Sequence, residues 1–138
     1  AIALSQYFGP QNAHLENPFE AAEAHGADLL RALWQQAHWD QNDYRLFYNV
    51  NFPPVAAADV KGRRVVAQGF RRETSFKVEA MIAPNQRRFL WIKGGAQDVP
   101  TQPDTDAHAN LAGYISITPM RADLTAHDAL SDLKSRLE

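Results

Sequence analysis

Hydrophobic and polar positions follow distinct patterns in successive parts of this chain. Residues 1–5 (AIALS) form a short continuous apolar run, which is typical of a parallel strand covered on both faces. Residues 45–52 (RLFYNVNF) alternate instead, so that one face of the predicted strand is apolar and the other carries Asn49 and Asn51. Two prolines follow directly and end this strand, because proline lacks the N–H group that a sheet requires.

Between these two strands, apolar residues recur at helical spacing. Asn17 is suited to the N-cap, Pro18 to the first helical position and Glu20 to the third, and the apolar face continues to about His38. The residues of this face are Phe19, Ala22, Gly26, Leu29, Leu30, Leu33 and Ala37. The pattern predicts one long helix that packs against a sheet.

Three further strands are predicted at residues 63–69, 74–82 and 87–93. The last two are joined by residues 83–86 (APNQ), in which proline and asparagine favour a chain reversal. A polar connection, residues 94–106, leads on from this predicted hairpin.

The end of the chain combines a short helix, a strand and a second helix. Residues 106–112 predict the short helix, with Gly113 well placed to end it, and residues 114–119 predict the strand. A helix with leucines on one face begins at about Thr125, which pairs with Asp128 in a pattern resembling a capping box. Together these elements indicate an α/β fold.

Composition adds that this is one packed domain. A chain of 138 residues with 45% hydrophobic residues can bury a sizeable core. No apolar run approaches the roughly 20 residues that a membrane-spanning helix needs, so no membrane partner is expected. The lack of cysteine excludes disulfides and thiolate metal sites and fits a reducing cytoplasm, which is the expected location.

Charge is distributed unevenly, although the net charge is only −2. Residues 61–93 hold nine basic and two acidic side chains, a net charge of +7, so the rest of the chain carries −9. Aromatic residues alternate with the arginines of this basic region. Such a surface could bind single-stranded nucleic acid, or it could be an oligomerisation surface with a solvated basic face. The second interpretation is preferred, and nucleic acid is kept as the alternative partner.

Three polar residues are candidates for the wall of an active site. Ser5 and Gln6 stand where the first strand ends, and ligands of open α/β sheets gather outside the carboxyl ends of strands. Asn51 shares a strand face with Asn49, and a buried amide must either bridge loops or face a polar cleft. An ordinary strand end and structural bridging are the competing interpretations.

The segment DTDAH contains Asp104, Asp106 and His108, residue types that can bind a divalent metal ion. The two aspartates also flank the start of the predicted short helix, where carboxylates accept hydrogen bonds from exposed N–H groups. Helix capping is the preferred interpretation, and no metal site is predicted here. Near the end of the chain, Asp123 and His127 are four residues apart and can meet across one helical turn.

Several motifs together resemble the survival protein E (SurE) family of metal-dependent 5′/3′-nucleotidases. They are AIALSQ, NVNFPP, QGFRR and, most specifically, GYISITPM leading into DLTAH. The resemblance implies the C-terminal portion of a Rossmann-like α/β fold with an antiparallel hairpin arm and a C-terminal helix. A strand of the buried type that starts at residue 1 without a polar lead-in, and a helix on an exposed link at the other end, are expected of part of a larger enzyme.

The resemblance also implies where the family's chemistry resides. Its metal ligands are an adjacent aspartate pair, a serine and an asparagine, and on the family pattern Ala1 falls after all four. We therefore expect no catalytic or metal-binding residue in this chain, and we expect the chain alone to be inactive. The full-length enzyme would hydrolyse nucleoside monophosphates with Mg²⁺ or Mn²⁺.

For assembly, the resemblance implies a homodimer or tetramer. It divides the chain into part of the core (residues 1–58), an oligomerisation arm (residues 59–94) and a closing strand with a helix exchanged between subunits (residues 95–138). Asp123 and His127 are expected at the hinge of that helix, and Arg71 and Arg72 among the oligomer contacts.

Overall fold

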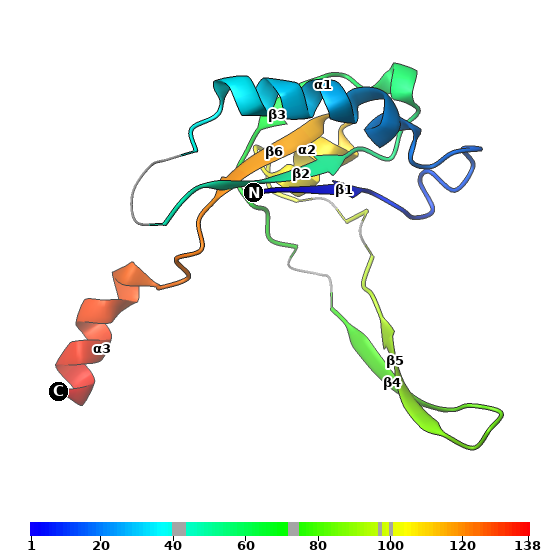
Figure 1. The fold of residues 1–138 in the computed structure, drawn as a ribbon. Coiled ribbons are helices and arrows are strands. Elements are labelled where there is room, and N and C mark those ends of the chain that lie inside the picture. The colour runs from blue at the N-terminus through cyan, green and yellow to red at the C-terminus, as the bar shows by residue number, and fades with distance from the viewer. Residues whose placement is uncertain (40–43, 72–74, 97, 100) are drawn as a thin grey trace.

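A computed structural model of the chain describes residues 1–39, 44–71, 75–96, 98–99 and 101–138. Its centre is a four-stranded mixed sheet with strand order β1-β2-β6-β3 (Figure 1). The strands are β1 (Ile2–Gln6), β2 (Phe47–Phe52), β6 (Ile115–Met120) and β3 (Arg63–Val65). β1 runs parallel to β2, β6 runs antiparallel to β2, and β3 runs parallel to β6. The expected α/β class is confirmed.

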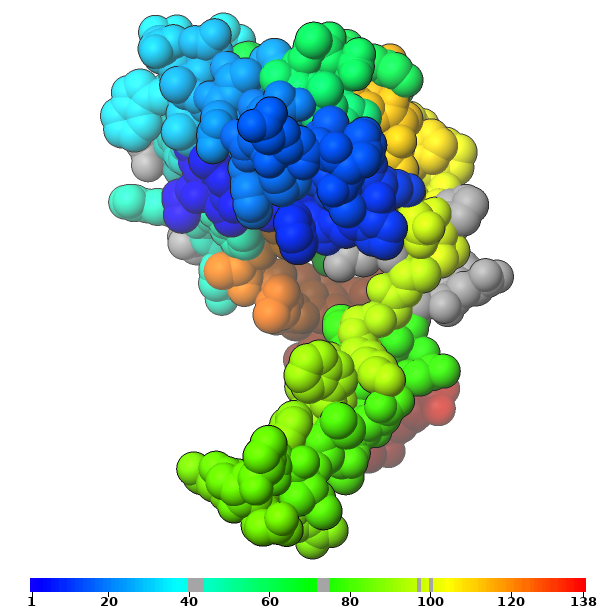
Figure 2. Space-filling model, turned by 90° about the vertical axis from the view of Figure 1, so that its right-hand side faces the viewer, coloured from blue at the N-terminus to red at the C-terminus, as the bar shows by residue number. Residues whose placement is uncertain are grey.

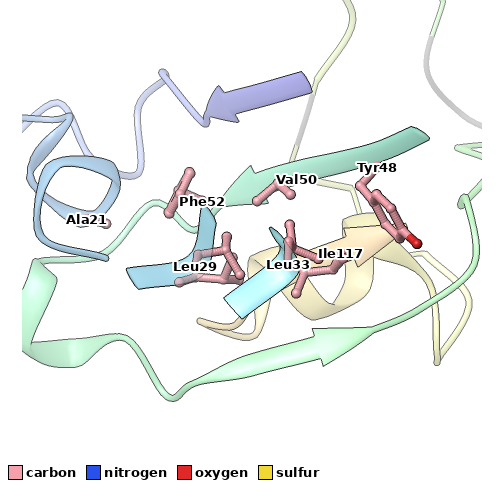
Figure 3. Packing of buried hydrophobic residues seen from close by; sticks show 8 residues of the cluster. Ala21, Leu29, Leu33, Tyr48, Val50, Phe52 and Ile117 are labelled. Carbon is pink, nitrogen blue, oxygen red and sulfur yellow. The ribbon is translucent and has the colours of Figure 1, made fainter. Parts of the chain in front are cut away.

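Helix α1 (Glu20–Gln36) covers one face of this sheet and forms the core with it (Figures 1 and 3). The alternation in β2 is confirmed, because its predicted apolar face is the buried one. The core cluster consists of Ala21, Leu29, Leu33, Tyr48, Val50, Phe52, Ile115 and Ile117. The Ala57 N–H donates a hydrogen bond to Glu20 Oε1, and the Ala57 carbonyl is hydrogen-bonded to His25 Nε2. These two contacts connect α1 to the short 3₁₀ helix η1 (Ala57–Asp59).

The predicted N-cap of α1 was wrong. The helix begins at Glu20, after Phe19, and no side chain caps it. Asn17 instead forms a turn before the helix: its Oδ1 accepts a hydrogen bond from the Phe19 N–H at 3.0 Å, and its Nδ2 donates to Glu23 Oε2 at 2.8 Å. Asn17 therefore still contacts the start of the helix, but it lies two residues before the N-cap position, which Phe19 occupies.

β1 is parallel, as expected, but it is not covered on both faces in this chain. Ala3, Leu4 and Ser5 are all exposed. β1 is exposed because it is an edge strand of the sheet, with β2 as its neighbour on one side. An apolar run therefore predicted the strand and its direction but not its covering.

The second face of the sheet is polar, and α2 (Asp106–Leu111) packs beside it against β6 and β2. Ser116 and Thr118 alternate with the core isoleucines of β6 and so point to this face, where both are buried. Ser116 lies directly opposite Asn51 of β2, which in turn lies opposite Ser5 of β1. Gly113 ends α2 with φ 91°, as its predicted C-cap role requires.

Two elements stand clear of the body (Figures 1 and 2). One is a hairpin of β4 (Lys77–Ile82) and β5 (Arg88–Lys93), joined by the predicted turn, in which Gln86 adopts φ 64°. We call residues 75–95 the arm. The sequence-based division also placed residues 63–65 in the arm, whereas the structure pairs them with β6 in the body sheet, because their short strand continues the sheet edge.

The other projecting element is α3 (Leu130–Leu137), preceded by the 3₁₀ helix η2 (His127–Ala129). Its leucines are exposed, and Leu124 in the preceding link is 93% exposed. The predicted capping box of Thr125 and Asp128 was wrong, because η2 and α3 both begin without a side-chain cap and the Thr125 N–H donates to Asp123 Oδ1. In the parts of the chain that the structure describes, no helix is long and apolar enough to cross a membrane.

Candidate functional site

A cleft of about 570 Å³ opens at the carboxyl ends of β1 and β2, on the polar side of the sheet. Parallel strands direct their carboxyl ends to the same edge, which is where ligands bind in open α/β sheets. Three segments complete the cleft: the residues just after β1, the segment at residues 68–71, and the first turns of α2. The lining residues are Ser5, Gln6, Tyr7, Phe8, Asn51, Gln68, Gly69, Arg71, Asp106, Ala107 and Asn110.

The structure brings all three sequence-predicted lining residues together here. Ser5 Oγ donates a hydrogen bond to Asn51 Oδ1, which links the ends of β1 and β2. Asn51 therefore combines both interpretations of the sequence, since it bridges two strands and also lines the cleft. Asn49 points to the same face two residues earlier but does not line the cleft.

Gln6 is fixed by backbone carbonyls just beyond the ends of β1 and β2. Its Nε2 donates to the Pro53 carbonyl at 2.8 Å and to the Tyr7 carbonyl at 3.3 Å. These contacts orient the amide, and its Oε1 is buried without a hydrogen-bond partner among the described residues. A buried acceptor on a cleft wall can accept a hydrogen bond from a ligand.

Asn12 holds the loop after β1 in place, and sequence reasoning missed it. The side chain is fully buried. Its Nδ2 donates to the Tyr7 carbonyl at 2.7 Å and to the Pro18 carbonyl at 3.2 Å, while its Oδ1 accepts from the Gly9 N–H. The only sequence signal was an asparagine within a Gly-Pro loop, which predicts a turn but not burial.

Asp106 joins the start of α2 to the segment at residues 67–69. Its Oδ1 accepts hydrogen bonds from the Ala107 N–H at 2.7 Å and the Gly69 N–H at 2.8 Å. A Cβ at Gly69 would lie only 3.0 Å from Thr105, so glycine permits this close approach. The predicted helix-start role of Asp106 is confirmed, although the N-cap itself is Thr105, whose Oγ1 accepts from the His108 N–H.

Arg71 lies half-buried in the cleft wall, where the chain leaves the body for the arm. Its role among the oligomer contacts stays a prediction. Arg72 lies outside the described residues. Sequence reasoning missed the cleft position of Arg71, because an arginine within a basic region carries no local sign of where the chain path places it.

The cleft residues do not fit a divalent metal ion by themselves. Among the described lining residues, Asp106 is the one carboxylate, and two backbone N–H groups already bind its Oδ1. Over the whole of the described chain, no group of three histidine, aspartate or glutamate side chains is arranged to hold a metal ion. Magnesium and manganese prefer several oxygen ligands, carboxylates above all.

The expected contact between Asp123 and His127 is confirmed. His127 Nε2 lies 2.7 Å from Asp123 Oδ2, and the Thr125 N–H donates to Asp123 Oδ1 at 3.0 Å. The hydrogen bond from His127, together with the one from the Thr125 backbone, lowers the pKa of Asp123 to about 2. Both residues precede α3, and neither of them lines the cleft.

Comparisons with known proteins agree with this architecture. A family profile described as "Survival protein SurE" matches residues 1–75. A protein named 5′-nucleotidase SurE from Cereibacter sphaeroides (strain ATCC 17025) is 64% identical over 135 residues, covering 98% of this chain and 52% of that protein. Another of the same name from Jannaschia sp. (strain CCS1) is 60% identical over 140 residues.

The fold has a solved counterpart as well. The crystal structure of the SurE protein from Aquifex aeolicus matches with a TM-score of 0.62 and 30% identity, covering 99% of this chain and 51% of that one. The present chain thus spans about half the length of the curated relatives it matches. On the profile match and these relatives, the chain belongs to the SurE family.

Proposed function

We propose that the protein containing this chain is a phosphomonoester hydrolase that acts on nucleoside 5′- and 3′-monophosphates in the cytoplasm. The observation that carries the proposal is the polar cleft at the carboxyl ends of β1 and β2, in a chain whose relatives are named 5′-nucleotidase SurE. Its volume of about 570 Å³ suits a nucleotide-sized ligand.

In the hydrolysis, water attacks phosphorus and the bond from phosphorus to the sugar oxygen breaks, releasing a nucleoside and inorganic phosphate. This chain would supply a wall of the site. Ser5 and Asn51 are held against each other by their hydrogen bond, and Gln6 is fixed by the Pro53 carbonyl. Side chains held in this way can position a substrate with little loss of entropy on binding.

The divalent ion would have to be bound elsewhere, since the cleft residues do not fit it. The family resemblance assigns Mg²⁺ or Mn²⁺ to an aspartate pair, a serine and an asparagine that this chain does not contain. The chain therefore contributes positioning rather than metal binding.

A comparison of the full-length protein with the isolated 138-residue chain tests this proposal. Both are assayed with AMP, 3′-AMP and p-nitrophenyl phosphate in the presence of Mn²⁺, and again after addition of a chelator. The full-length protein should hydrolyse the nucleotides in a metal-dependent manner, and the isolated chain should not. Metal-dependent turnover by the purified chain alone would contradict the division of roles.

We further propose that the arm and α3 are contacts of a homodimer or tetramer. Support comes from exposed apolar side chains on both elements, including Trp91 at 53% and Leu137 at 77% exposure. A partner subunit would remove such surfaces from water. Nucleic acid is the second candidate partner, since Phe76, Phe89 and Trp91 are exposed beside basic residues. Binding that falls steeply with salt concentration would favour nucleic acid over self-association.

A further inference from the structure

Asn110 has a buried amide that the described chain leaves without a partner. The residue is 6% exposed, lies in α2 and lines the cleft. Its Nδ2 makes no hydrogen bond within the described residues. A buried N–H donor without an acceptor destabilises the folded protein, so each such group in a native structure calls for an explanation.

Arg71 lines the same cleft and carries a charge that the described chain does not neutralise. No carboxylate lies within salt-bridge distance of it among the described residues. Asp106 is the acidic residue in the part of the lining that the structure describes, and its Oδ1 is already bound by the Gly69 and Ala107 N–H groups. Within the described residues, the cleft lining thus holds a buried amide donor and a guanidinium that have no acceptor.

These two groups select an oxygen-rich anion. A guanidinium presents a planar set of donors that matches phosphate, and an amide N–H adds a further donor. We propose that Asn110 and Arg71 bind the phosphate oxygens of the nucleotide that occupies this cleft. The inference rests on the proposed function and adds to it two residues that act on the phosphate from this chain.

A purely structural explanation makes different predictions for the two residues. If Asn110 were an ordinary buried polar residue, it would behave like Thr118, whose Oγ1 is also buried and unpartnered but lies outside the cleft. If Arg71 were an assembly residue, as the sequence suggested, its loss would change the oligomeric state. Both alternatives can be tested in the full-length protein.

The first experiment pairs Asn110→Leu with the control Thr118→Val. Each change replaces an unsatisfied polar group with an apolar one of similar size, so each should raise the melting temperature of the ligand-free protein, by about 2–4 °C. Only Asn110→Leu should weaken phosphate recognition. We expect its KM for AMP and its Ki for inorganic phosphate to rise about tenfold, with both unchanged in Thr118→Val.

The second experiment pairs Arg71→Gln with Arg31→Gln, an exposed arginine on α1. Arg71→Gln should raise the same two constants about 10- to 100-fold and leave the oligomeric state measured by light scattering unchanged. Thermal shifts induced by inorganic phosphate, AMP and adenosine give a readout independent of turnover. The phosphate and AMP shifts should shrink in the Asn110 and Arg71 variants, while any adenosine shift is retained.

The outcomes separate the two proposals. If wild-type protein hydrolyses AMP but both variants keep wild-type constants and phosphate shifts, the phosphate-binding role is overturned and the nucleotidase proposal stands. Loss of only the adenosine shift would also overturn it, because the residues would then contact the nucleoside. Wild-type protein that neither hydrolyses AMP nor shifts with phosphate would overturn both proposals.

Discussion

The body of the chain and its two projecting elements use similar residues in opposite ways. In the body, the apolar face of β2 meets α1, and Val50 and Phe52 are almost completely buried. In the arm, β4 and β5 are just as rich in apolar residues, yet every residue of both strands is exposed. The leucines of α3 are exposed as well. The body therefore closes its core within the chain, whereas the projecting elements depend on surfaces that the chain does not supply.

The largest effect is expected from a change in the body core. Phe52→Ala removes a fully buried ring between α1 and the sheet and should lower the free energy of unfolding of the full-length protein by about 3–5 kcal/mol. The control is Phe76→Ala in the arm, at 76% exposure in the chain, which should change that free energy by less than about 0.5 kcal/mol when both variants are compared at a protein concentration too low for assembly. Urea denaturation measures both values. Equal losses would mean that the arm and the body share one core.

The next largest effect concerns assembly. Removing the turn at residues 84–86 with the adjoining strand ends should lower the oligomeric state of the full-length protein and leave the body folded. The reason is that β4 and β5 pair only with each other among the described residues, so the sheet of the body loses no strand. Light scattering gives the mass, and circular dichroism checks the fold. An unchanged mass would remove the arm from the assembly contacts.

A smaller effect is expected where the body meets the base of the arm. Gly69→Ala would place a Cβ about 3.0 Å from Thr105 and 3.1 Å from Asp106 Oδ1. Such overpacking costs about 1–3 kcal/mol, and it should also weaken AMP hydrolysis by displacing the cleft wall at residues 68–71. Gly62→Ala is a control for the loss of a glycine, with no atom within 4 Å of its added Cβ but with strain from its φ of 117°. If Gly69→Ala kept full activity and stability, the packing at Thr105 would be looser than the structure indicates.

The same comparison explains what the sequence could and could not predict. Alternation in residues 45–52 predicted the buried face of β2 correctly, because that face is covered by a helix from the same chain. The apolar run at residues 1–5 could not predict that β1 would be exposed, because such a run does not show whether the same chain covers the strand. Local spacing predicted the contact between Asp123 and His127. The cleft positions of Arg71 and Asn110, by contrast, arise from tertiary placement of segments about 40 residues apart.

The smallest expected effect is at the link between the body and α3. The Asp123 side chain is only 24% exposed, and hydrogen bonds from His127 and the Thr125 N–H lower its pKa from 3.8 to about 2. A carboxylate with a lowered pKa stabilises the folded link above its ordinary pKa, and this contribution is lost as pH falls through about 2. His127→Ala removes the largest cause, so the pKa of Asp123 should rise toward 3.8. The difference in stability of the link between wild type and His127→Ala should accordingly be present above about pH 4 and vanish near pH 2.

Carbon-13 NMR of labelled aspartate carboxyl groups in the full-length protein measures this pKa directly. His108→Ala is the control, because His108 lies in α2 and makes no ion pair with Asp123. If the contact also sets the direction of the link, replacing both Asp123 and His127 by alanine should change the assembly seen by light scattering and leave the circular dichroism of the sheet unaltered. A pKa for Asp123 that stays near 2 in His127→Ala would show that Thr125 alone holds the carboxylate, and the link would then owe its direction to the backbone turn rather than to the histidine.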